Sequence, residues 1–363
     1  MAQGFRRTGP GCRDAVVARD AAFAVLTSGH RRQMRVVVVG ASGNVGSTVV
    51  KALSDEPQVS SIVGVARRQP QWQPPKTEWI TADITRDDLL PALRGADVVV
   101  HLAWQFQPTH DPYVTWETNV VGTARLLDAL HRAGVAALVY ASSVGAYSPA
   151  AGDEPVDETW PTHGWPMAAY GREKAYVERL LDAHAAEYPD RRIVRLRPAF
   201  IFQTEAASQQ RRLFAGPLLP GRLIRPELVP IVPWPRGLRF QALHADDVAD
   251  AYRRAVVEKV RGPFNIAADQ VVTGEQMAQL LGARLVELPP DVVRASMWSA
   301  WQARLVPASP DLFDLARRLP IMDTQRARTE LGWSPRQSGP DAVATFLHGL
   351  SHRAGGPTPP LAA

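Results

Sequence analysis

The sequence predicts an α/β protein whose parallel sheet is wound on both sides by helices. Short runs rich in valine and isoleucine recur along the first 200 residues, and segments with apolar residues at helical spacing separate them. One run of valines passes directly into three glycines, Gly40, Gly43 and Gly46, which a helical segment follows. Strands that alternate with helices are typical of a parallel, doubly wound sheet.

The expected elements follow from the spacing of apolar residues. Continuous apolar runs indicate buried strands at 35–39, 62–66, 79–81, 97–102, 137–141 and 193–196. Apolar residues three or four apart indicate helices at 44–53, 86–93, 113–133 and 167–188. After Pro198 the pattern changes, because 216–237 holds six prolines and is expected to be a loop that lines a pocket. Beyond it we expect a short strand at 264–266 and helices at 246–258, 274–282, 291–306 and 324–331.

Both ends of the chain are expected to be irregular. Residues 1–33 mix arginine, glycine and alanine and are typical of a disordered extension. Their apolar run, 21–26, is short for a signal peptide, so a targeting peptide is the weaker alternative. Residues 351–363 are rich in glycine, proline and alanine and are expected to be a flexible tail.

Composition argues against several classes of protein. The net charge is +5, but the first 35 residues hold seven arginines and two aspartates, so the rest of the chain is neutral and nucleic-acid binding is not expected. No apolar stretch reaches 18 residues, so no membrane span is expected. Cys12 is the single cysteine, which excludes an intrachain disulfide and fits a cytoplasmic protein. The histidines show no metal-binding spacing with carboxylates, and no metal is expected.

The glycine turn is a candidate site for the pyrophosphate of a dinucleotide. Glycines between a strand and a helix allow a tight turn and close approach of a phosphate, and the helix N-terminus supplies free N–H groups. Packing alone is the alternative, because a bare strand-turn-helix also uses glycine. The residues expected to contact the cofactor in this turn are Gly40, Ser42, Gly43, Asn44, Val45 and Gly46.

The second strand indicates which dinucleotide binds. An NAD site usually places an acidic residue about 20 positions after the glycines. Ala66 stands there, and Arg67 and Arg68 follow it. Two guanidinium groups suit a 2′-phosphate, so we favour NADP over NAD. Both arginines being solvated loop residues is the alternative.

Tyr170 and Lys174 are a candidate acid–base pair. Four residues apart on a helix, they share one face. An ammonium beside a phenol favours the phenolate and is expected to lower the pKa of Tyr170 toward neutrality, which makes it a usable general acid or base. Alone, this spacing also fits a surface tyrosine with a solvated lysine.

Taken together, the motifs resemble those of the short-chain dehydrogenase/reductase superfamily, in its extended, NAD-dependent epimerase/dehydratase branch. The resemblance covers roughly 34–340. It is carried, in the order of that family, by GASGNVG (40–46), Asp83-Ile84, HLAW (101–104), NVVGT (119–123), ASSVGAY (141–147), YGREK (170–174), RLRP (195–198), HADDVADA (244–251) and LGWSPR (331–336).

The resemblance implies a fold and an assembly. It implies a Rossmann domain that binds NAD(P), made of 34–199 and 238–267, with a smaller, discontinuous C-terminal domain for the substrate, made of 200–237 and 268–350. It also implies a possible homodimer through the helices expected at 113–133 and 167–188.

The resemblance also assigns roles to residues. Tyr170 is the implied acid or base and Lys174 its partner, which also reaches the sugar hydroxyls of the cofactor. Ser143, four residues before Tyr147, is preferred to Ser142 as the hydroxyl that binds the reacting oxygen; both serines merely ending a strand is the alternative. The remaining implied cofactor contacts are Asp83 and Ile84 beside the adenine, Leu102 and Ala103 near the nicotinamide, and Pro198.

Two positions depart from family members that act on nucleotide sugars. Phe200 and Phe240 stand where those proteins usually carry an asparagine and an arginine that hold a diphosphate, and Arg239 is one residue off. These replacements favour a less charged or more apolar small-molecule substrate. Anion binding remains open through Gln209, Gln210, Arg211 and Arg212.

The expected function is NAD(P)-dependent redox chemistry on a hydroxyl or carbonyl group of a small molecule. Epimerisation or dehydration is one version, and carbonyl reduction is the other. A regulator or redox sensor that binds NAD(P) on the same fold is the alternative from another class.

Overall fold

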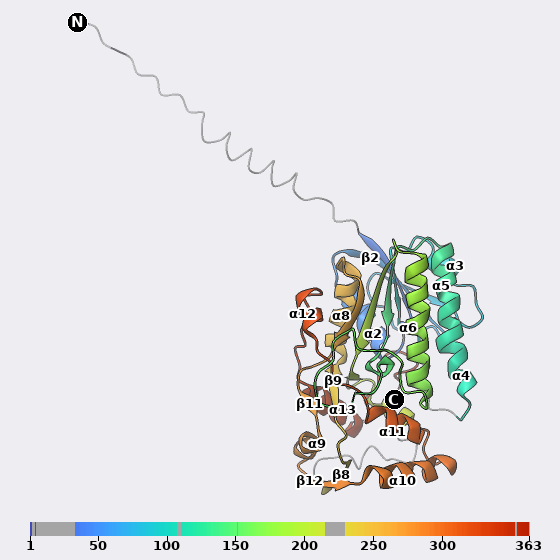
Figure 1. The fold of residues 1–363 in the computed structure, drawn as a ribbon. Helices are drawn as coiled ribbons and strands as arrows, with labels where there is room; N and C mark the ends of the chain where they lie inside the picture. Colours follow the sequence, from blue (N-terminus) through green and yellow to red (C-terminus); the bar gives the residue numbers. More distant parts are fainter. Residues whose placement is uncertain are drawn as a thin grey trace. The chain divides into compact units, whose positions relative to one another are not determined.

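A parallel sheet of seven strands forms the centre of the computed structural model (Figure 1). The structure describes residues 1, 4, 33–106, 110–150, 152–214, 229–352 and 354–362, without the side chains of 211–214. The extension expected at 1–33 lies almost entirely outside the described residues. Across the sheet the strands are β10 (Gly262–Ile266), β6 (Arg192–Pro198), β5 (Ala137–Ala141), β4 (Val98–His101), β1 (Met34–Val39), β2 (Val59–Ala66) and β3 (Thr77–Thr81).

The order of the strands reverses at β1. All neighbours run parallel, and β1 lies between β4 and β2, so the chain leaves β1 toward one edge and later returns to its other side. Ligands of open α/β sheets bind at the carboxyl ends of the strands where the strand order reverses. The glycine turn follows β1 at this point. The doubly wound α/β fold predicted from the sequence is therefore confirmed.

Helices cover both faces of the sheet (Figure 1). On one face α2 (Asn44–Ser54) and α8 (Ala245–Val257) pack through Val49, Leu53, Val248 and Tyr252, all buried. On the other face α5 (Gly122–Arg132) and α6 (Ala169–Glu187) pack through leucine and valine side chains that are also buried. Burial on both faces explains why the strands are continuously apolar rather than alternating.

Two expected helices differ from those in the structure. The helix expected at 86–93 is only α3 (Leu90–Leu93), because the Asp83 and Asp88 carboxylates accept bonds from the N–H groups of Thr85 and Leu90 and hold turns before it. The helix expected at 113–133 is α4 (Pro112–Trp116), a π-helical turn (Glu117–Val121) and α5. Spacing of apolar residues does not reveal such a turn.

Smaller elements collect beyond the carboxyl edge of the large sheet. One small sheet has the order β11 (Val271–Val272), β9 (Phe240–His244) and β7 (Phe200–Phe202), and the other pairs β12 (Arg284–Leu288) with β8 (Ile231–Pro235). The accompanying helices are α7 (Ala207–Phe214), α9 (Gly274–Leu281), α10 (Pro290–Gln302), α11 (Pro310–Ala316) and α13 (Gly339–Ser351). In contrast, α12 (Gln325–Thr329) packs beside the start of β10, where Arg326 donates to the carbonyls of Pro263 and Arg261. β8 lies within the expected proline-rich loop; its prolines are tolerated because a two-stranded sheet has only edge strands.

The segment expected to be a flexible tail is folded back onto the glycine turn, which corrects that prediction for 354–362. Leu361 and Thr358 are each 1% exposed. Gly356 N–H donates to the Leu361 carbonyl at 2.8 Å, and the Thr358 hydroxyl donates to the carbonyl of Ser42 at 2.7 Å. An apolar anchor and a buried hydroxyl therefore hold a segment whose composition alone suggests disorder.

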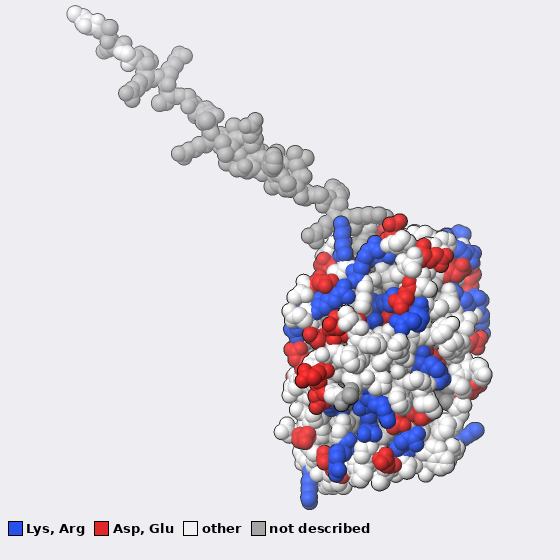
Figure 2. Space-filling view, viewed as in Figure 1, with Lys and Arg blue, Asp and Glu red and all other residues white. Residues whose placement is uncertain are grey.

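The face of the molecule seen in Figure 2 shows no single dominant charge. On the face seen in Figure 2, basic and acidic side chains are interspersed. Among the described residues, no helix has the length and apolar character needed to cross a bilayer.

The Thr358 contact gives a first prediction. We expect Thr358→Val to lower the free energy of unfolding by about 1 kcal/mol, because the Ser42 carbonyl loses its buried partner. Urea denaturation measures the change. Thr345→Val is the matched control, since the Thr345 hydroxyl bonds only to Asp341 of its own helix. Equal losses in both variants would contradict a specific role for the Ser42 contact.

Candidate active site

The glycine turn leaves room for a phosphate and no room for side chains beneath it. Gly40 has φ +88°, and a Cβ there would lie 2.5 Å from the backbone nitrogen of Ala103. A Cβ on Gly46 would overlap the Gly40 carbonyl, whereas one on Gly43 would only touch it at 3.4 Å. Gly43 is the N-cap of α2 and provides no side-chain cap, so the first N–H groups of the helix stay available. These features fit a dinucleotide pyrophosphate.

Distant segments fix the rest of the turn. The Gln203 amide donates to the backbone carbonyl of Asn44 at 2.9 Å and also bonds its side chain. Thr358 bonds Ser42, as described above. Val45, like Asn44, is half-buried in the first turn of α2. Gln203 and Thr358 were not expected from the sequence, since only tertiary contact reveals their role.

Two exposed arginines, Arg67 and Arg68, follow the end of β2. Neither Arg67 nor Arg68 forms an ion pair within the described part of the chain. Asp83 follows β3, and its carboxylate accepts two bonds from Thr85. Burial alone would raise the pKa of Asp83, but these bonds and the charges of Arg86 and Arg67 bring the pKa below its usual value. Ile84 is buried against Gly122.

The end of β4 passes directly beside the glycine turn. The N–H of Leu102 donates to the carbonyl of Val39 at 2.8 Å, which places Ala103 against Gly40. Trp104 then extends to the catalytic side, with its ring edge-on to Tyr170 at 5.9 Å between centroids. Phe106 contacts the same tyrosine ring at 4.7 Å.

Tyr170 and Ser143 are brought together as expected. The phenolic hydroxyl donates to Ser143 Oγ at 2.8 Å, and Ser143 Oγ accepts the N–H of Gly145 at 3.0 Å. A Cβ on Gly145 would lie 2.6 Å from the Tyr170 ring, so the glycine permits this approach. Ser142 points away and donates to Glu178 at 2.6 Å. The geometry therefore separates the two serines in the way that the sequence suggested.

Lys174 does not act on Tyr170 in the expected way. Its ammonium donates to the carbonyl of Ala141 at 2.7 Å, lies 3.4 Å from the centre of the Trp104 ring, and is 5.9 Å from that of Tyr170. Burial raises the pKa of Tyr170 to about 12, against a smaller lowering by the Ser143 bond. Burial also brings the pKa of Lys174 well below its ordinary value. The expected lowering of the Tyr170 pKa is therefore wrong for the structure without ligand, because desolvation dominates.

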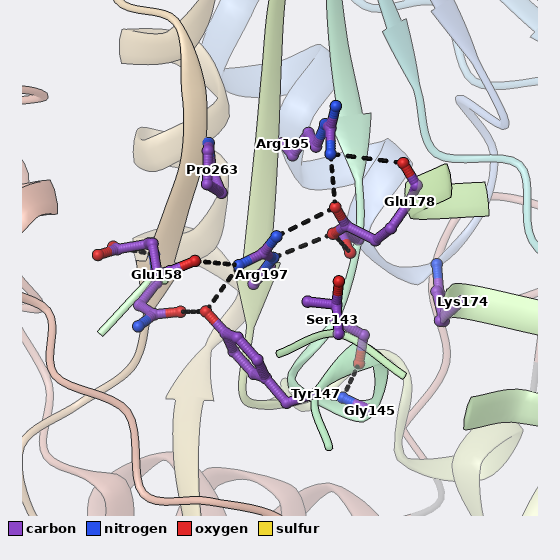
Figure 3. A network of polar contacts seen from close by, with 12 residues as sticks. Ser143, Gly145, Tyr147, Glu158, Lys174, Glu178, Arg195, Arg197 and Pro263 are labelled. Carbon is purple, nitrogen blue, oxygen red and sulfur yellow. Dashed lines mark hydrogen bonds and ion pairs between the residues drawn. The ribbon is translucent and has the colours of Figure 1, made fainter. Parts of the chain in front are cut away.

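A buried ion cluster lies directly behind these residues (Figure 3). Glu178, which is 0% exposed, bonds Arg195 at 2.9 Å and Arg197 at 3.0 Å as well as Ser142. Burial would raise the pKa of Glu178, but the two guanidinium groups and the serine bring it down to about 2. Arg197 also donates to the hydroxyl of Tyr147. Arg195 and Arg197 are two residues apart on β6, so their side chains lie on the same face of the strand. The spacing of the two arginines in the motif RLRP indicates this shared face, although no role was predicted for them from the sequence.

The two positions that the resemblance associates with diphosphate binding, Phe200 and Phe240, pack against each other. Phe200 and Phe240 lie 5.0 Å apart between ring centroids, and Trp234 stacks on Phe240 at 6.4 Å. Arg239 pairs with Asp153 and donates to the carbonyl of Gly152 at 2.7 Å, so it is engaged elsewhere. Pro198, at the end of β6, is buried.

The polar residues through which anion binding was left open, 209–212, have different surroundings. Gln210 donates to the carbonyl of Ile201 at 2.7 Å, while its buried amide oxygen has no partner among the described residues. Gln209 is half-buried on α7. The side chains of Arg211 and Arg212 lie outside the described part. Within the described residues, no group of three or more His, Cys, Asp or Glu is placed to hold a metal ion.

Comparison with known proteins identifies the family. Residues 36–267 match the NAD dependent epimerase/dehydratase family. A UDP-glucose 4-epimerase of Mycolicibacterium smegmatis is 28% identical over 328 residues, which are 86% of this chain and 96% of that protein. An uncharacterized protein of Mycobacterium tuberculosis, Rv2047c, is 27% identical over 325 residues, 89% of this chain; the chain spans only 31% of the length of that relative.

Solved structures share the fold. The UDP-glucose 4-epimerase of Thermus thermophilus in complex with NAD has a TM-score of 0.65 and 21% identity, covering 87% of this chain and 99% of that one. MoeE5 in complex with UDP-glucuronic acid and NAD has a TM-score of 0.65 and 23% identity over 88% of this chain and 99% of that chain.

The ion cluster makes acid stability testable. Because the pKa of Glu178 falls from 4.5 to about 2 on folding, its contribution is complete above the unfolded pKa and is lost as the pH falls toward 2. We expect Glu178→Gln to lose about 3–5 kcal/mol at neutral pH and to flatten the decline in stability between pH 4.5 and 2. Denaturant titrations across this range measure both effects. The exposed Glu187→Gln, on the same helix, should change neither.

Proposed function

The chain belongs to the NAD dependent epimerase/dehydratase family, and from that premise we propose that it oxidises or reduces a hydroxyl or carbonyl carbon of a small molecule. The observation that carries the proposal is the 2.8 Å contact between Tyr170 and Ser143 at the carboxyl edge of the sheet, beside Lys174 and Ala103. Epimerisation or dehydration and simple reduction both begin from this geometry. Net consumption of the dinucleotide distinguishes reduction from the other two.

Ser143 and Tyr170 have different roles, one in binding and the other in proton transfer. Ser143 Oγ and the Tyr170 hydroxyl are close enough to hold one substrate oxygen between them, since both are at hydrogen-bond distance of a common point. Ser143 orients that oxygen, and Tyr170 gives or takes the proton. With its pKa near 12, Tyr170 is protonated at neutral pH and is ready as an acid. The bound dinucleotide supplies or accepts the hydride.

We propose that the dinucleotide binds at the positions that the sequence predicts. Gly40, Gly43, Gly46 and the N–H groups of the first α2 turn hold the pyrophosphate, and Lys174 holds the ribose hydroxyls. Related structures contain NAD. Arg67 and Arg68 have no ion-pair partner among the described residues where a 2′-phosphate would lie, which supports NADP for this chain.

The substrate we propose carries a hydroxyl but no diphosphate. Relatives act on UDP-sugars according to their names, yet Phe200 and Phe240 pack on each other where a diphosphate would need cations. Burying a phosphate against aromatic rings without a partner is unfavourable. The aromatic wall therefore supports a less charged, sugar-like or alicyclic substrate.

We also propose that two copies pair through α4, the π-helical turn and α6. Tyr113, Val114, Val121 and Tyr176 are large apolar side chains on these elements and are exposed to solvent. Exposed apolar patches of this kind mark interfaces. Sedimentation should show a dimer for the full chain and a monomer for Tyr176→Glu; an unchanged mass would reject this surface.

Tyr170→Phe tests the chemistry. We expect turnover to fall by about 10²–10⁴-fold, because the proton donor is removed while the ring and its packing stay. A panel of carbonyl compounds, followed by nicotinamide absorbance, supplies the assay. Tyr176→Phe, on the same helix but exposed, is the matched control. Normal turnover in Tyr170→Phe would remove the acid–base role and favour a regulator that binds the dinucleotide.

Titration with NADPH and NADH tests the cofactor. We expect NADPH to bind about tenfold more tightly, and Arg67→Ala to abolish the difference, because a charge-assisted contact to the 2′-phosphate is lost. Quenching of tryptophan fluorescence reports binding. Arg94→Ala, an exposed arginine away from the end of β2, is the control. Equal affinity for both dinucleotides would leave NAD as the cofactor and both arginines as solvated side chains.

A further inference from the structure

A second cavity lies on the α6 face of the sheet, apart from the glycine turn. It has a volume of about 530 Å³ and extends along β6 between the C-terminal half of α6, the loop 158–163 and the start of β10. None of Ser143, Tyr170 and Lys174 lines it. Its size is in the range of sites for small ligands.

The cavity carries more positive than negative charge. Five guanidinium groups line it, against the carboxylates of Glu158 and Asp182, with Glu178 buried behind them. The five belong to Arg179, Arg191, Arg195, Arg197 and Arg261. Carboxylates pair with Arg179 on α6 and with Arg195 and Arg197 on β6. Within the described residues, Arg191 and Arg261 form no ion pair.

The two uncompensated arginines are held in place by neutral groups. Arg261 donates to the carbonyls of Pro189, Asp190 and Arg191 at 2.8–3.1 Å. Arg191 donates to the carbonyl of Val135 at 3.0 Å and contacts His184 Nε2 at 2.6 Å. Their guanidinium groups are thus positioned without being neutralised.

The excess positive charge helps to lower the pKa values of two neighbouring groups. Burial, with the charge of Arg191, lowers the pKa of His184, which keeps the ring neutral and able to accept from that arginine. Burial, with the charge of Arg261, lowers the pKa of Arg192. A bound anion would relieve both repulsions.

The other walls suit a hydroxylated carbon skeleton. Glu158 is more than half-buried at the cavity, accepts the N–H of Asn265 at 2.7 Å, and offers carboxylate oxygens to hydroxyl donors. The indole of Trp160 is fixed by its bond to the Ser148 carbonyl at 3.0 Å and presents an apolar surface. Phosphate beside guanidinium groups, hydroxyls beside a carboxylate and carbon beside an aromatic ring are favourable pairings.

We propose that this cavity is a second ligand site, which binds a phosphorylated sugar or polyol. Arg191 and Arg261 face the phosphate, and Glu158 and Trp160 contact the hydroxylated part. The site adjoins the candidate active site. Arg195 bonds Glu178 (Figure 3), and Glu178 accepts the hydroxyl of Ser142, the residue before Ser143.

Calorimetric titration of the full chain with glucose 6-phosphate, glucose and inorganic phosphate tests the site. Saturating NADP is present throughout, so that the proposed dinucleotide site at the glycine turn is occupied. We expect glucose 6-phosphate to bind more tightly than inorganic phosphate and glucose not to bind. In Arg261→Ala the affinity for glucose 6-phosphate should fall at least tenfold, whereas Arg236→Ala, an exposed arginine outside the cavity, should leave it unchanged.

Three results would overturn the proposal: no heat with any probe, binding unchanged in Arg261→Ala, or binding only when NADP is omitted. Arg191→Ala, which removes the other guanidinium group placed at the phosphate, replaces Arg261→Ala if that variant does not fold. If neither NADP nor NAD binds, the proposed function fails. The dependence on Arg261 is then measured without a dinucleotide and still decides this site.

Discussion

The pairing of buried Glu178 with two arginines is the interaction on which the geometry of the candidate active site depends. A carboxylate with no exposure is stable only when cations and hydrogen bonds surround it. Glu178 lies two helical turns after Tyr170 and one after Lys174, and it joins α6 to β6 and to Ser142 at the end of β5. The same contacts therefore set the register of α6 against the strand that carries Ser143. The Tyr170–Ser143 distance follows from that register.

Burial has a second effect on the same helix, because it favours the neutral forms of Tyr170 and Lys174. The pKa values of the two groups shift in opposite directions, the tyrosine upward and the lysine downward. The ammonium of Lys174 is held by Ala141 and the face of Trp104 instead of by the phenol. Trp104, which follows Ala103, thus gives Lys174 a partner within the chain. The electrostatics of Tyr170 and Lys174 therefore depend on a residue outside α6.

The sequence predicted what local patterns determine and missed what tertiary contacts determine. The buried strands and the glycine turn follow from apolar runs and motif spacing, and the structure places them as expected. The choice of Ser143 came from the family resemblance, and the structure puts its hydroxyl beside that of Tyr170. The four-residue spacing of Tyr170 and Lys174 correctly gave a common helix face, but not the distance between their polar atoms. The prolines of β8 predicted a loop although the segment is a strand, and Thr358 gained its role from a partner 316 residues away.

The residues that hold the glycine turn also determine when, during synthesis of the chain, the turn is fixed. β1 and α2 emerge early in synthesis and can pair locally, since domains assemble from the N-terminus as the chain is made. The carbonyls of Asn44 and Ser42, however, receive their partners from 159 and 316 residues further along. A ribosome must therefore release nearly all of the described chain before the turn is fixed. A chain that stops before residue 358 lacks the hydroxyl that binds the carbonyl of Ser42, so its glycine turn keeps only the contacts from nearer segments.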